Sequence, residues 1–527
     1  MKQLIMRKKL VVFLLGLVAC MALPPISLWP FMLAAFAAHF FILNTVHSEN
    51  KGLLLSYIFG VGYFVGGLYW IANATLVDWH NFWWAYPFAL IGLPLLLALF
   101  WGVAGYVTVR FSQPHSSERY ILYILSFSIT EWLRGVLFTG FPWNLPGYAW
   151  DSLPQMLQIT SIGGIYLLSL FTIAAGVSIG SLIACRRMKN TYRLKDARNV
   201  LSVVFIIILP CIFVFGSLRM PVQNTTAEET AFLVVQPNIA QKIKWEPEQI
   251  PNHISTLLQL SDYNAEKYPS LPTKQLYIVW PETALSQPYI DHSSIREKIV
   301  QSLESWPVET ELFAGVIHIE KDKRSNEPYY YNSIYHLGSH GQMMARYDKT
   351  RLVPFGEYMP LMLDRIVTPI TGFQGFRHGE NRQPFITADG KNIYPLICYE
   401  TIFPQHIAPR KDNTTSAAML SITDDSWYGN TSGPYQHNAI ARVRAIEQGI
   451  PIIRAANTGV SDAFDVYGRQ IGSPIAFDTK DAALYFLPKP IEKGTFFAQY
   501  HNLIFYIFLI GLGGLLTWEK HKKTKNP

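Results

Sequence analysis

The sequence predicts a mixed membrane protein, with eight transmembrane α-helices and a separate α/β domain outside the cytoplasm. Half of the 527 residues are hydrophobic and only 15% are charged, whereas average soluble domains are about a quarter charged. Apolar stretches fill residues 1–220 and recur once near the C-terminus. The region between them is charged and punctuated by proline, which is typical of a globular domain.

Eight apolar stretches define the expected membrane helices. Most approach or exceed the roughly 20 residues that are needed to span the hydrocarbon core of a bilayer. We expect a membrane domain over 1–220, a globular domain over 221–499, and an eighth helix with a basic tail over 500–527. The stretches cover residues 10–28, 31–46, 53–76, 88–109, 121–138, 157–184, 200–218 and 503–518.

The placement of basic residues predicts the orientation. Lysine and arginine gather at the N-terminus, in the loop with Lys189, Arg193 and Lys195, and in the tail, but are absent from loops 24–30, 77–87 and 139–154. Basic loops stay in the cytoplasm, so both termini are expected there and the globular domain outside. As an alternative, Leu17 to Cys20 resembles a lipoprotein signal-peptide processing site, although the spans that follow favour a retained helix.

Composition argues against several other classes. A net charge of +7 is too small and dispersed to indicate nucleic-acid binding. Four scattered cysteines favour neither a disulfide scaffold nor a zinc cluster. No glycine-rich phosphate loop or dinucleotide motif follows a predicted strand, so nucleotide chemistry has no support. We expect neither a metal nor a cofactor. Tryptophan and tyrosine in the outer loops favour an interfacial belt over substrate contacts.

The region 221–499 alternates β-rich runs with helical patterns, which predicts a layered α/β domain. The expected helices cover 250–267 and 437–448. The expected strands cover 231–236, 275–280, 311–318, 332–337, 393–397 and 417–422.

Three polar residues of this domain stand where strands are expected to end, and they form a candidate catalytic set. Glu282 follows YIVWP, Lys349 lies in YDKTRLVPFGEY and Cys398 follows IYPLI. A cysteine reacts as its thiolate, which an ammonium group favours, and a glutamate can accept the thiol proton. Individually, a buried cysteine and two surface charges are the ordinary interpretation. However, Cys398 is the only cysteine of the domain, and a lone thiol in an oxidising compartment favours a functional role.

Longer motifs around these residues resemble a known family. VWPETAL, YDKTRLVPFGEYMP, LICYETIFP and the segment SITDDSWYGNTSGPYQHNAIARVRAIEQGIPIIRAANTG are similar to the nitrilase (carbon–nitrogen hydrolase) superfamily. With the membrane segment EWLRGVLFTGFPWNLPGYAW, nearly the whole chain resembles the apolipoprotein N-acyltransferase family. The resemblance implies an αββα sandwich on the periplasmic side of the bacterial inner membrane.

The family also implies the reaction and its participants. An acyl chain passes from a phospholipid, typically phosphatidylethanolamine, to Cys398 as a thioester. It then passes to the α-amine of the diacylglyceryl-cysteine that begins an apolipoprotein. By match to the motifs, Glu282 is the base, Lys349 stabilises the oxyanion and Cys398 is the nucleophile.

Other positions match supporting residues or depart from the family. Asp424, Asp425, Ser426 and Tyr428 stand where the family more often has other residues, and an extra carboxylate there would alter nearby pKa values. Supporting roles are implied for Glu357, Tyr399, Glu400 and, in a loop over the site, Trp245.

Some alternatives stay open at this point. Glu131 and Arg134 are spaced i, i+3 in the fifth predicted helix, so an internal ion pair competes with contact between Arg134 and a lipid phosphate. A membrane-anchored amidase with the same three catalytic residues is the alternative activity. A transporter or receptor is the alternative from another class, but it leaves the lone thiol unexplained.

Overall fold

The computed structural model describes residues 2–187, 197–221, 230–269, 271, 273–322, 326–359, 375–407, 410–411 and 414–525. The predicted basic residues Lys189, Arg193 and Lys195 lie outside these residues. The expected domain boundary after residue 220 lies at the end of the described range 197–221. The chain forms two compact units. The membrane unit comprises Met1–Ala72, Ala85–Val222 and Thr495–Pro527, and the globular unit comprises Asn73–Trp84 and Gln223–Gly494.

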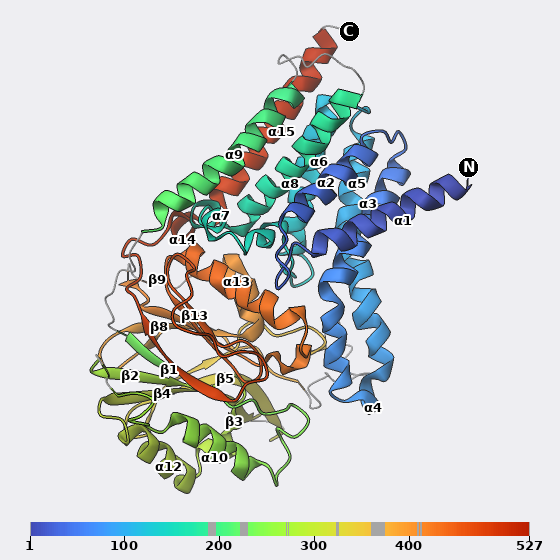
Figure 1. Ribbon diagram of the computed structural model, residues 1–527. Helices are drawn as coiled ribbons and strands as arrows, with labels where there is room; N and C mark the ends of the chain where they lie inside the picture. Colours follow the sequence, from blue (N-terminus) through green and yellow to red (C-terminus); the bar gives the residue numbers. More distant parts are fainter. Residues whose placement is uncertain are drawn as a thin grey trace. The chain divides into compact units, whose positions relative to one another are not determined.

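The membrane unit is helical, and each of the eight predicted stretches coincides with a helix in the described part of the chain (Figure 1). Short helices α7 (Pro154–Leu157) and α14 (Phe496–Tyr500) lie between the long ones in the sequence, whereas short α4 (Trp79–Phe82) belongs to the globular unit. The long helices are α1 (Lys2–Cys20), α2 (Pro30–Leu43), α3 (Glu49–Leu68), α5 (Leu93–Arg110), α6 (Ser117–Arg134), α8 (Thr160–Arg187), α9 (Ala197–Arg219) and α15 (Leu503–Lys525).

Five helical segments within the described ranges are long and apolar enough to cross a membrane, namely Glu49–Leu76, Trp79–Arg110, Thr160–Cys185, Ala197–Arg219 and Leu503–Lys522. Helix α2 has only 14 residues, α1 begins with a basic half, and α6 includes four charged residues. The spans expected at these three helices therefore stay predictions.

Close backbone approach and aromatic packing hold the membrane unit together. Helix α1 packs on α3, and a Cβ atom added to Gly62 would lie 2.1 Å from the Phe13 carbonyl oxygen. Small residues permit such contacts between membrane helices. Fully buried Trp101 of α5 stacks on Tyr63 of α3 with ring centroids 4.9 Å apart.

The globular unit contains two β-sheets. The larger sheet has the order β14-β1-β2-β4-β5-β6, and β3 pairs with β4. Strands β1, β2 and β4 are parallel, and the other pairs on the main path are antiparallel. The strands are β1 (Thr230–Gln236), β2 (Gln275–Val279), β3 (Leu285–Ser286), β4 (Glu309–Lys321), β5 (Pro328–Leu337), β6 (Met343–Asp348) and β14 (Asp481–Leu487).

The second sheet has the order β13-β12-β11-β8-β7, in which β8, β11 and β12 are parallel. A separate pair joins β9 (Arg410–Lys411) and β10 (Thr414–Thr415). The strands of the second sheet are β7 (Phe385–Ile386), β8 (Asn392–Ile397), β11 (Ala418–Thr423), β12 (Ile452–Ala456) and β13 (Asp462–Phe464).

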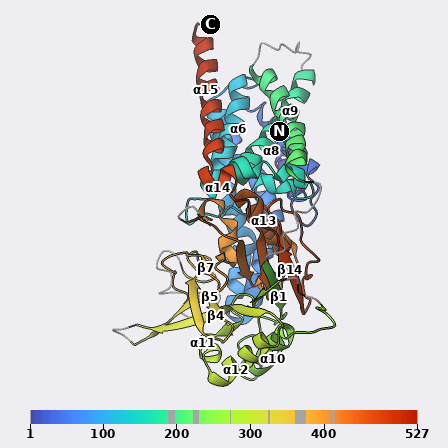
Figure 2. The same cartoon turned by 90° about the vertical axis from the view of Figure 1, so that its left-hand side faces the viewer.

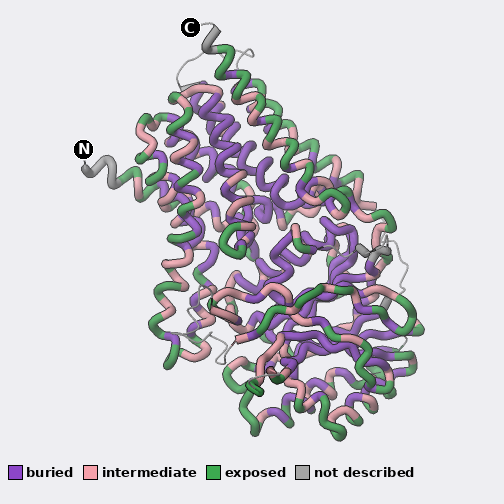
Figure 3. The backbone as a smooth tube through the Cα atoms, turned by 180° about the vertical axis from the view of Figure 1, so that it is seen from behind, coloured by how far each residue is buried: buried purple, intermediate pink, exposed green. Residues whose placement is uncertain are grey.

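Helices cover the outer faces of the two sheets (Figure 2). Helices α10 (Ile250–Ser261) and α12 (Ser293–Glu304) share a core with the first sheet, and short α11 (Gln287–Ile290) packs beside them. Helix α13 (Ser432–Gln448) packs on the second sheet. The inner faces meet in a third core, so the strands are mostly buried (Figure 3). This is the four-layer αββα sandwich that the family resemblance implies.

Local sequence explains the elements that carry the site. All five residues of β2 are buried, as expected for a central strand of a parallel sheet. Helix α13 begins where the Thr431 side chain accepts a hydrogen bond from Gly433 N, and ends at Gly449, whose φ of 67° is left-handed. Both are common helix-end signals. In contrast, β6 lacks a continuous apolar run and was not expected from the sequence.

Candidate active site

The structure places the three predicted catalytic residues together at strand ends. Glu282 follows β2, Lys349 directly follows β6, and Cys398 directly follows β8. Two of these strands belong to the first sheet and one to the second. All three side chains are buried. Lys349 Nζ lies 3.2 Å from Glu282 Oε1, and both charges act on the pKa of the Cys398 thiol.

The Glu357 carboxylate, the Asn332 amide and a backbone N–H group hold the Lys349 and Glu282 side chains in place. Lys349 Nζ donates to Glu357 Oε1 at 2.8 Å as well as to Glu282. Asn332 Nδ2 donates to Glu282 Oε1 at 2.7 Å and to Glu357 Oε1 at 2.9 Å. The second oxygen of Glu282 accepts from the Asp424 N–H at 2.8 Å. Glu357 thus lies where a supporting residue was predicted, whereas sequence reasoning missed Asn332 of β5.

Burial and neighbouring charges together set the protonation states of the site. Burial raises the pKa of the Glu282 carboxyl, although the Lys349 ammonium opposes this shift. Burial disfavours the charge of Lys349, but Glu357 and Glu282 together raise its pKa above the ordinary lysine value. Lys349 therefore stays charged at neutral pH, and Glu282 is suited to exchange protons.

The resting nucleophile differs from the sequence-based expectation of a thiolate favoured by lysine. Burial and the Glu282 charge raise the pKa of the Cys398 thiol, and the opposing effect of Lys349 is smaller. Cys398 is therefore a thiol at neutral pH. A base must remove its proton as the sulfur attacks, which is a role for the neighbouring Glu282.

The backbone of Cys398 is in a conformation that non-glycine residues seldom adopt. Its φ is 49°, at the point where β8 ends and a tight helical turn begins. Such conformations persist only where the surroundings enforce them. His437 Nε2 lies 3.2 Å from the Cys398 carbonyl oxygen. Asp425 contacts both the His437 ring and Arg454, so three buried polar side chains support this turn. His437 and Arg454 were not predicted.

Glu400 joins the cysteine turn to the lysine loop. Its Oε2 accepts from Ile397 N at 2.9 Å, and its Oε1 accepts from Tyr347 Oη at 2.6 Å and Thr350 N at 2.9 Å. The guanidinium of Arg382 also donates to Oε1. Burial opposes a charge here, but Arg382 and the hydrogen bonds hold the pKa of Glu400 below its ordinary value. Glu400 therefore connects the Cys398 turn to the loop that follows Lys349.

The other predicted supporting residues have different surroundings. Tyr399 is buried and meets Phe403 edge to face, with ring centroids 5.0 Å apart. Trp245 is 36% exposed, and the Lys244 ammonium lies 5.9 Å from its ring centroid.

The four residues that depart from the family lie in one turn beside Glu282. Asp424 forms a buried ion pair with Lys244, with 2.6 Å between Nζ and Oδ2. Ser426 Oγ donates to Asp424 Oδ1 at 2.6 Å. Asn73 of the same compact unit donates to the Tyr428 carbonyl oxygen at 3.0 Å. The Asp424 carboxylate and the Ser426 hydroxyl therefore each have a partner, and sequence reasoning missed Lys244.

In the membrane unit, Arg134 is 1% exposed. Its guanidinium donates to Glu131 Oε2 at 2.7 Å and to the Trp143 carbonyl oxygen at 2.9 Å. Trp101 Nε1 donates to Glu131 Oε1 at 2.8 Å. These contacts favour the ion-pair interpretation of the two charges. Contact between Arg134 and a lipid phosphate stays a prediction.

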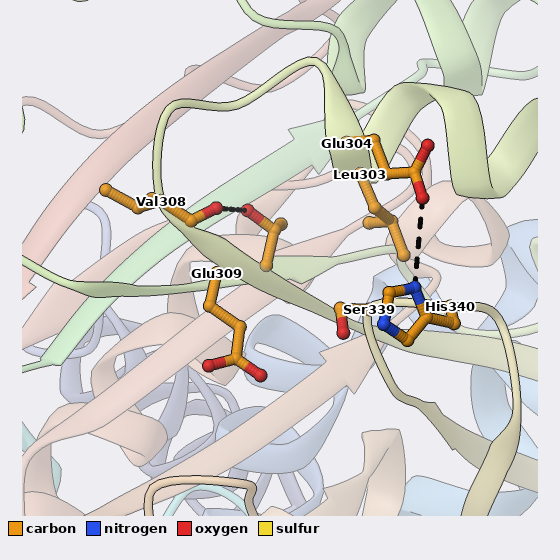
Figure 4. A pocket seen from close by; sticks show the side chains of 7 residues that line it. Leu303, Glu304, Val308, Glu309, Ser339 and His340 are labelled. Carbon is orange, nitrogen blue, oxygen red and sulfur yellow. Dashed lines mark hydrogen bonds and ion pairs between the residues drawn. The ribbon is translucent and has the colours of Figure 1, made fainter.

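A surface pocket of about 300 Å³ at one end of β4 lacks the chemistry of the site (Figure 4). Its only ion pair among the described residues joins exposed Glu304 and His340, with 3.8 Å between Oε1 and Nδ1. The lining consists of Leu303, Glu304, Val308, Glu309, Thr310, Ser339 and His340. None of the predicted site residues lines it.

Comparisons with known proteins cover both units. Residues 15–178 match the apolipoprotein N-acyltransferase N-terminal domain, and residues 234–479 match the carbon-nitrogen hydrolase family. An apolipoprotein N-acyltransferase of Rhizobium rhizogenes is 35% identical over 493 residues, which is 88% of this chain and 87% of the relative. One of Rickettsia bellii is 32% identical over 510 residues, 96% of this chain and 97% of the relative.

Solved structures of the nitrilase superfamily resemble about half of the chain. Saccharomyces cerevisiae Nit3, of the nitrilase superfamily, matches with a TM-score of 0.37 and 15% identity over 54% of this chain and 98% of that chain. The matches in sequence extend over most of both chains and include the membrane domain as well as the hydrolase domain. The chain therefore belongs to the apolipoprotein N-acyltransferase family.

Proposed function

We propose that this protein transfers an acyl chain from a phospholipid to the N-terminal amine of diacylglyceryl apolipoproteins, through a thioester on Cys398. The buried group of Glu282, Lys349 and Cys398 carries the proposal, because it supplies a nucleophile, a base and an oxyanion partner. Relatives that match most of the chain are named apolipoprotein N-acyltransferases, which supports transfer of an acyl chain to an apolipoprotein amine.

In the first step, Glu282 removes the proton of Cys398 as the sulfur attacks an ester carbonyl of the phospholipid. The Lys349 ammonium stabilises the negative oxygen of the tetrahedral intermediate, as positioned charges do in such reactions. The intermediate collapses when the carbon–oxygen bond to the glycerol breaks. Protonated Glu282 returns its proton to the leaving oxygen, so a lysophospholipid departs and the thioester remains.

In the second step, the α-amine of the apolipoprotein attacks the thioester carbonyl. Glu282 accepts a proton from this amine, and Lys349 again stabilises the oxyanion. The carbon–sulfur bond then breaks, the sulfur recovers the proton, and an amide is formed. Cys398 is only 6% exposed, and such burial favours transfer over hydrolysis because water is largely excluded.

The membrane unit suits substrates that stay in the bilayer. Each buried CH₂ group retains a lipidated molecule by about 0.8 kcal/mol, so both substrates must be met at the membrane surface. We propose eight membrane helices in the bacterial inner membrane, with both termini cytoplasmic and the globular unit periplasmic. The predicted arrangement of basic loops supports this orientation.

Mass spectrometry of the purified enzyme tests the function. After incubation with phosphatidylethanolamine, we expect one acyl group on the Cys398 peptide, and its loss when a diacylglyceryl-cysteine peptide is added and becomes triacylated. Cys398→Ala should form no adduct, whereas Cys211→Ala, which removes an exposed cysteine of the membrane unit, should form it normally. An acyl group on another residue, or release of free fatty acid without triacylated peptide, would refute the transfer.

A further inference from the structure

Lys244 uses its whole hydrogen-bonding capacity next to the proposed base. The side chain lies in the turn after β1 and is 2% exposed. Its ammonium donates to the Glu282 carbonyl oxygen at 3.2 Å, to Thr283 Oγ1 at 2.9 Å and to Asp424 Oδ2 at 2.6 Å. An ammonium has three N–H groups, so none is left for a substrate.

Asp424 contacts both Lys244 and Glu282, so that each of the three residues contacts the other two. Its carboxylate pairs with Lys244, and its backbone N–H donates to Glu282 Oε2 at 2.8 Å. Ser426 and Asn457 also donate to this carboxylate. Lys244 in turn holds the Glu282 carbonyl oxygen. The same pair therefore fixes both the backbone of Glu282 and the N–H group that orients its carboxylate.

The backbone next to the base needs such support. Thr283 has a φ of 48°, which is unusual for a β-branched residue and persists only when neighbouring groups enforce it. The Thr283 side chain and the preceding carbonyl both accept hydrogen bonds from Lys244. Release of this donor would let the strand end relax and would move the Glu282 side chain.

We propose that Lys244 and Asp424 form a positioning pair that holds the carboxylate of Glu282 in place for proton exchange with Cys398. This inference rests on the proposed role of Glu282 as the base. The proposal also gives a role to the Asp424 carboxylate, which anchors the Lys244 ammonium. Lys244 in turn neutralises the Asp424 charge. Neither residue of the pair is catalytic, since each acts through Glu282.

Two rates test the pair. The first is formation of the acyl-thioester with phosphatidylethanolamine. The second is alkylation of Cys398 by iodoacetamide, followed peptide by peptide, which requires no lipid. For Lys244→Met, we expect both rates to fall about 10- to 100-fold, on the scale of a small misplacement of a catalytic group. The KM for phospholipid should change less than twofold.

The exposed ion pair of Lys267 provides a matched control. Lys267 Nζ also donates to an aspartate and to a backbone carbonyl oxygen, with 2.6 Å to Asp481 Oδ1 and 2.6 Å to Ala482 O. Lys267→Met should keep wild-type rates. Should Lys244→Met fail to fold, Thr283→Val removes a single acceptor and should slow both rates about threefold.

Asp424→Asn separates positioning from general stability. The Asp424 charge raises the pKa of Glu282, after the larger effects of burial, Lys349 and Glu357. The acid limb of thioester formation should therefore move to lower pH in this variant. The double variant Lys244→Met/Asp424→Asn should be no slower than the slower single variant, because both act on the same group.

The outcomes distinguish the inference from the function. If wild-type enzyme forms the acyl adduct and folded Lys244→Met matches it in both rates, the positioning pair is wrong and the proposed function stands. If wild-type enzyme forms no adduct, the proposed function fails and the alkylation rates alone decide the inference. Variants that only unfold at lower temperature, with unchanged rates and an unchanged acid limb, would overturn it.

Discussion

Glu400→Gln is the most informative single change, because one carboxylate holds two parts of the site. Glutamine keeps the size of the side chain but removes the charge opposite Arg382. It also replaces one acceptor oxygen by an NH₂ group. That group would face Ile397 N, or Tyr347 and Thr350, which are hydrogen-bond donors to Glu400 in the wild-type protein. Removal of one partner from a buried ion pair costs about 3–5 kcal/mol.

The expected loss of stability follows from this value. A large domain loses about 2 °C in melting temperature per kcal/mol, so Glu400→Gln should melt at least about 6 °C below wild type at pH 7. The Glu400 pKa is lowered in the folded state, so its stabilisation is complete above the ordinary glutamate pKa of about 4.3. It is lost as the pH falls through the lower folded-state pKa. The difference between the two proteins should shrink over that acidic range.

Thermal unfolding in detergent, followed by intrinsic fluorescence from pH 3 to 8, measures both effects. Glu320→Gln is the control, because Glu320 also pairs with an arginine, Arg346, but is 36% exposed. Exposed pairs contribute about 0–1 kcal/mol, so this variant should melt close to wild type. If Glu400→Gln melts within about 1 °C of Glu320→Gln at pH 7, Glu400 does not hold the Cys398 turn and the lysine loop together as we infer from its contacts.

Three further outcomes are expected. Lys349→Met should slow thioester formation by roughly 10²–10³-fold, as loss of a main oxyanion partner does; a burst assay of lysophospholipid release within threefold of wild type would contradict this. Because burial raises the pKa of Glu282, the acid limb of the pH–rate profile for thioester formation should have its midpoint above about pH 4.3, the ordinary glutamate pKa. A midpoint at or below that pH in a stopped assay would count against Glu282 as the base. Arg134→Met should lower the melting temperature of the membrane unit, because Glu131 is left buried without its cation. The double variant Glu131→Gln/Arg134→Met should restore the melting temperature. A raised KM for phospholipid with no loss of stability would instead indicate that Arg134 contacts lipid.

The sequence predicted those parts of the fold that local pattern determines. The strand expected at 231–236 is β1 (Thr230–Gln236), and the one expected at 393–397 is β8 (Asn392–Ile397), because continuous apolar runs mark buried parallel strands. Strand β6 alternates less clearly, and only one of its six residues is buried. Its position is determined by pairing with β5, which a local pattern does not reveal.

The candidate site was predictable where a motif surrounds a residue, and not where partners are distant in the chain. Glu282, Lys349 and Cys398 stand in recognisable motifs, and the structure brings them together. Lys244 was overlooked beside Trp245, because a lysine in a polar turn is normally a surface charge. Its partner Asp424 lies 180 positions away. The sequence also could not show that burial outweighs Lys349 in setting the state of the thiol.

The division of the reactive groups between two sheets has a consequence for biogenesis. Glu282 and Lys349 come from one sheet and Cys398 from the other, and they meet only when the inner faces close on each other. A partly assembled chain thus has the sulfur without its proton acceptor. Chemical competence should therefore arise late in folding, which would spare newly made molecules from premature reaction of the thiol.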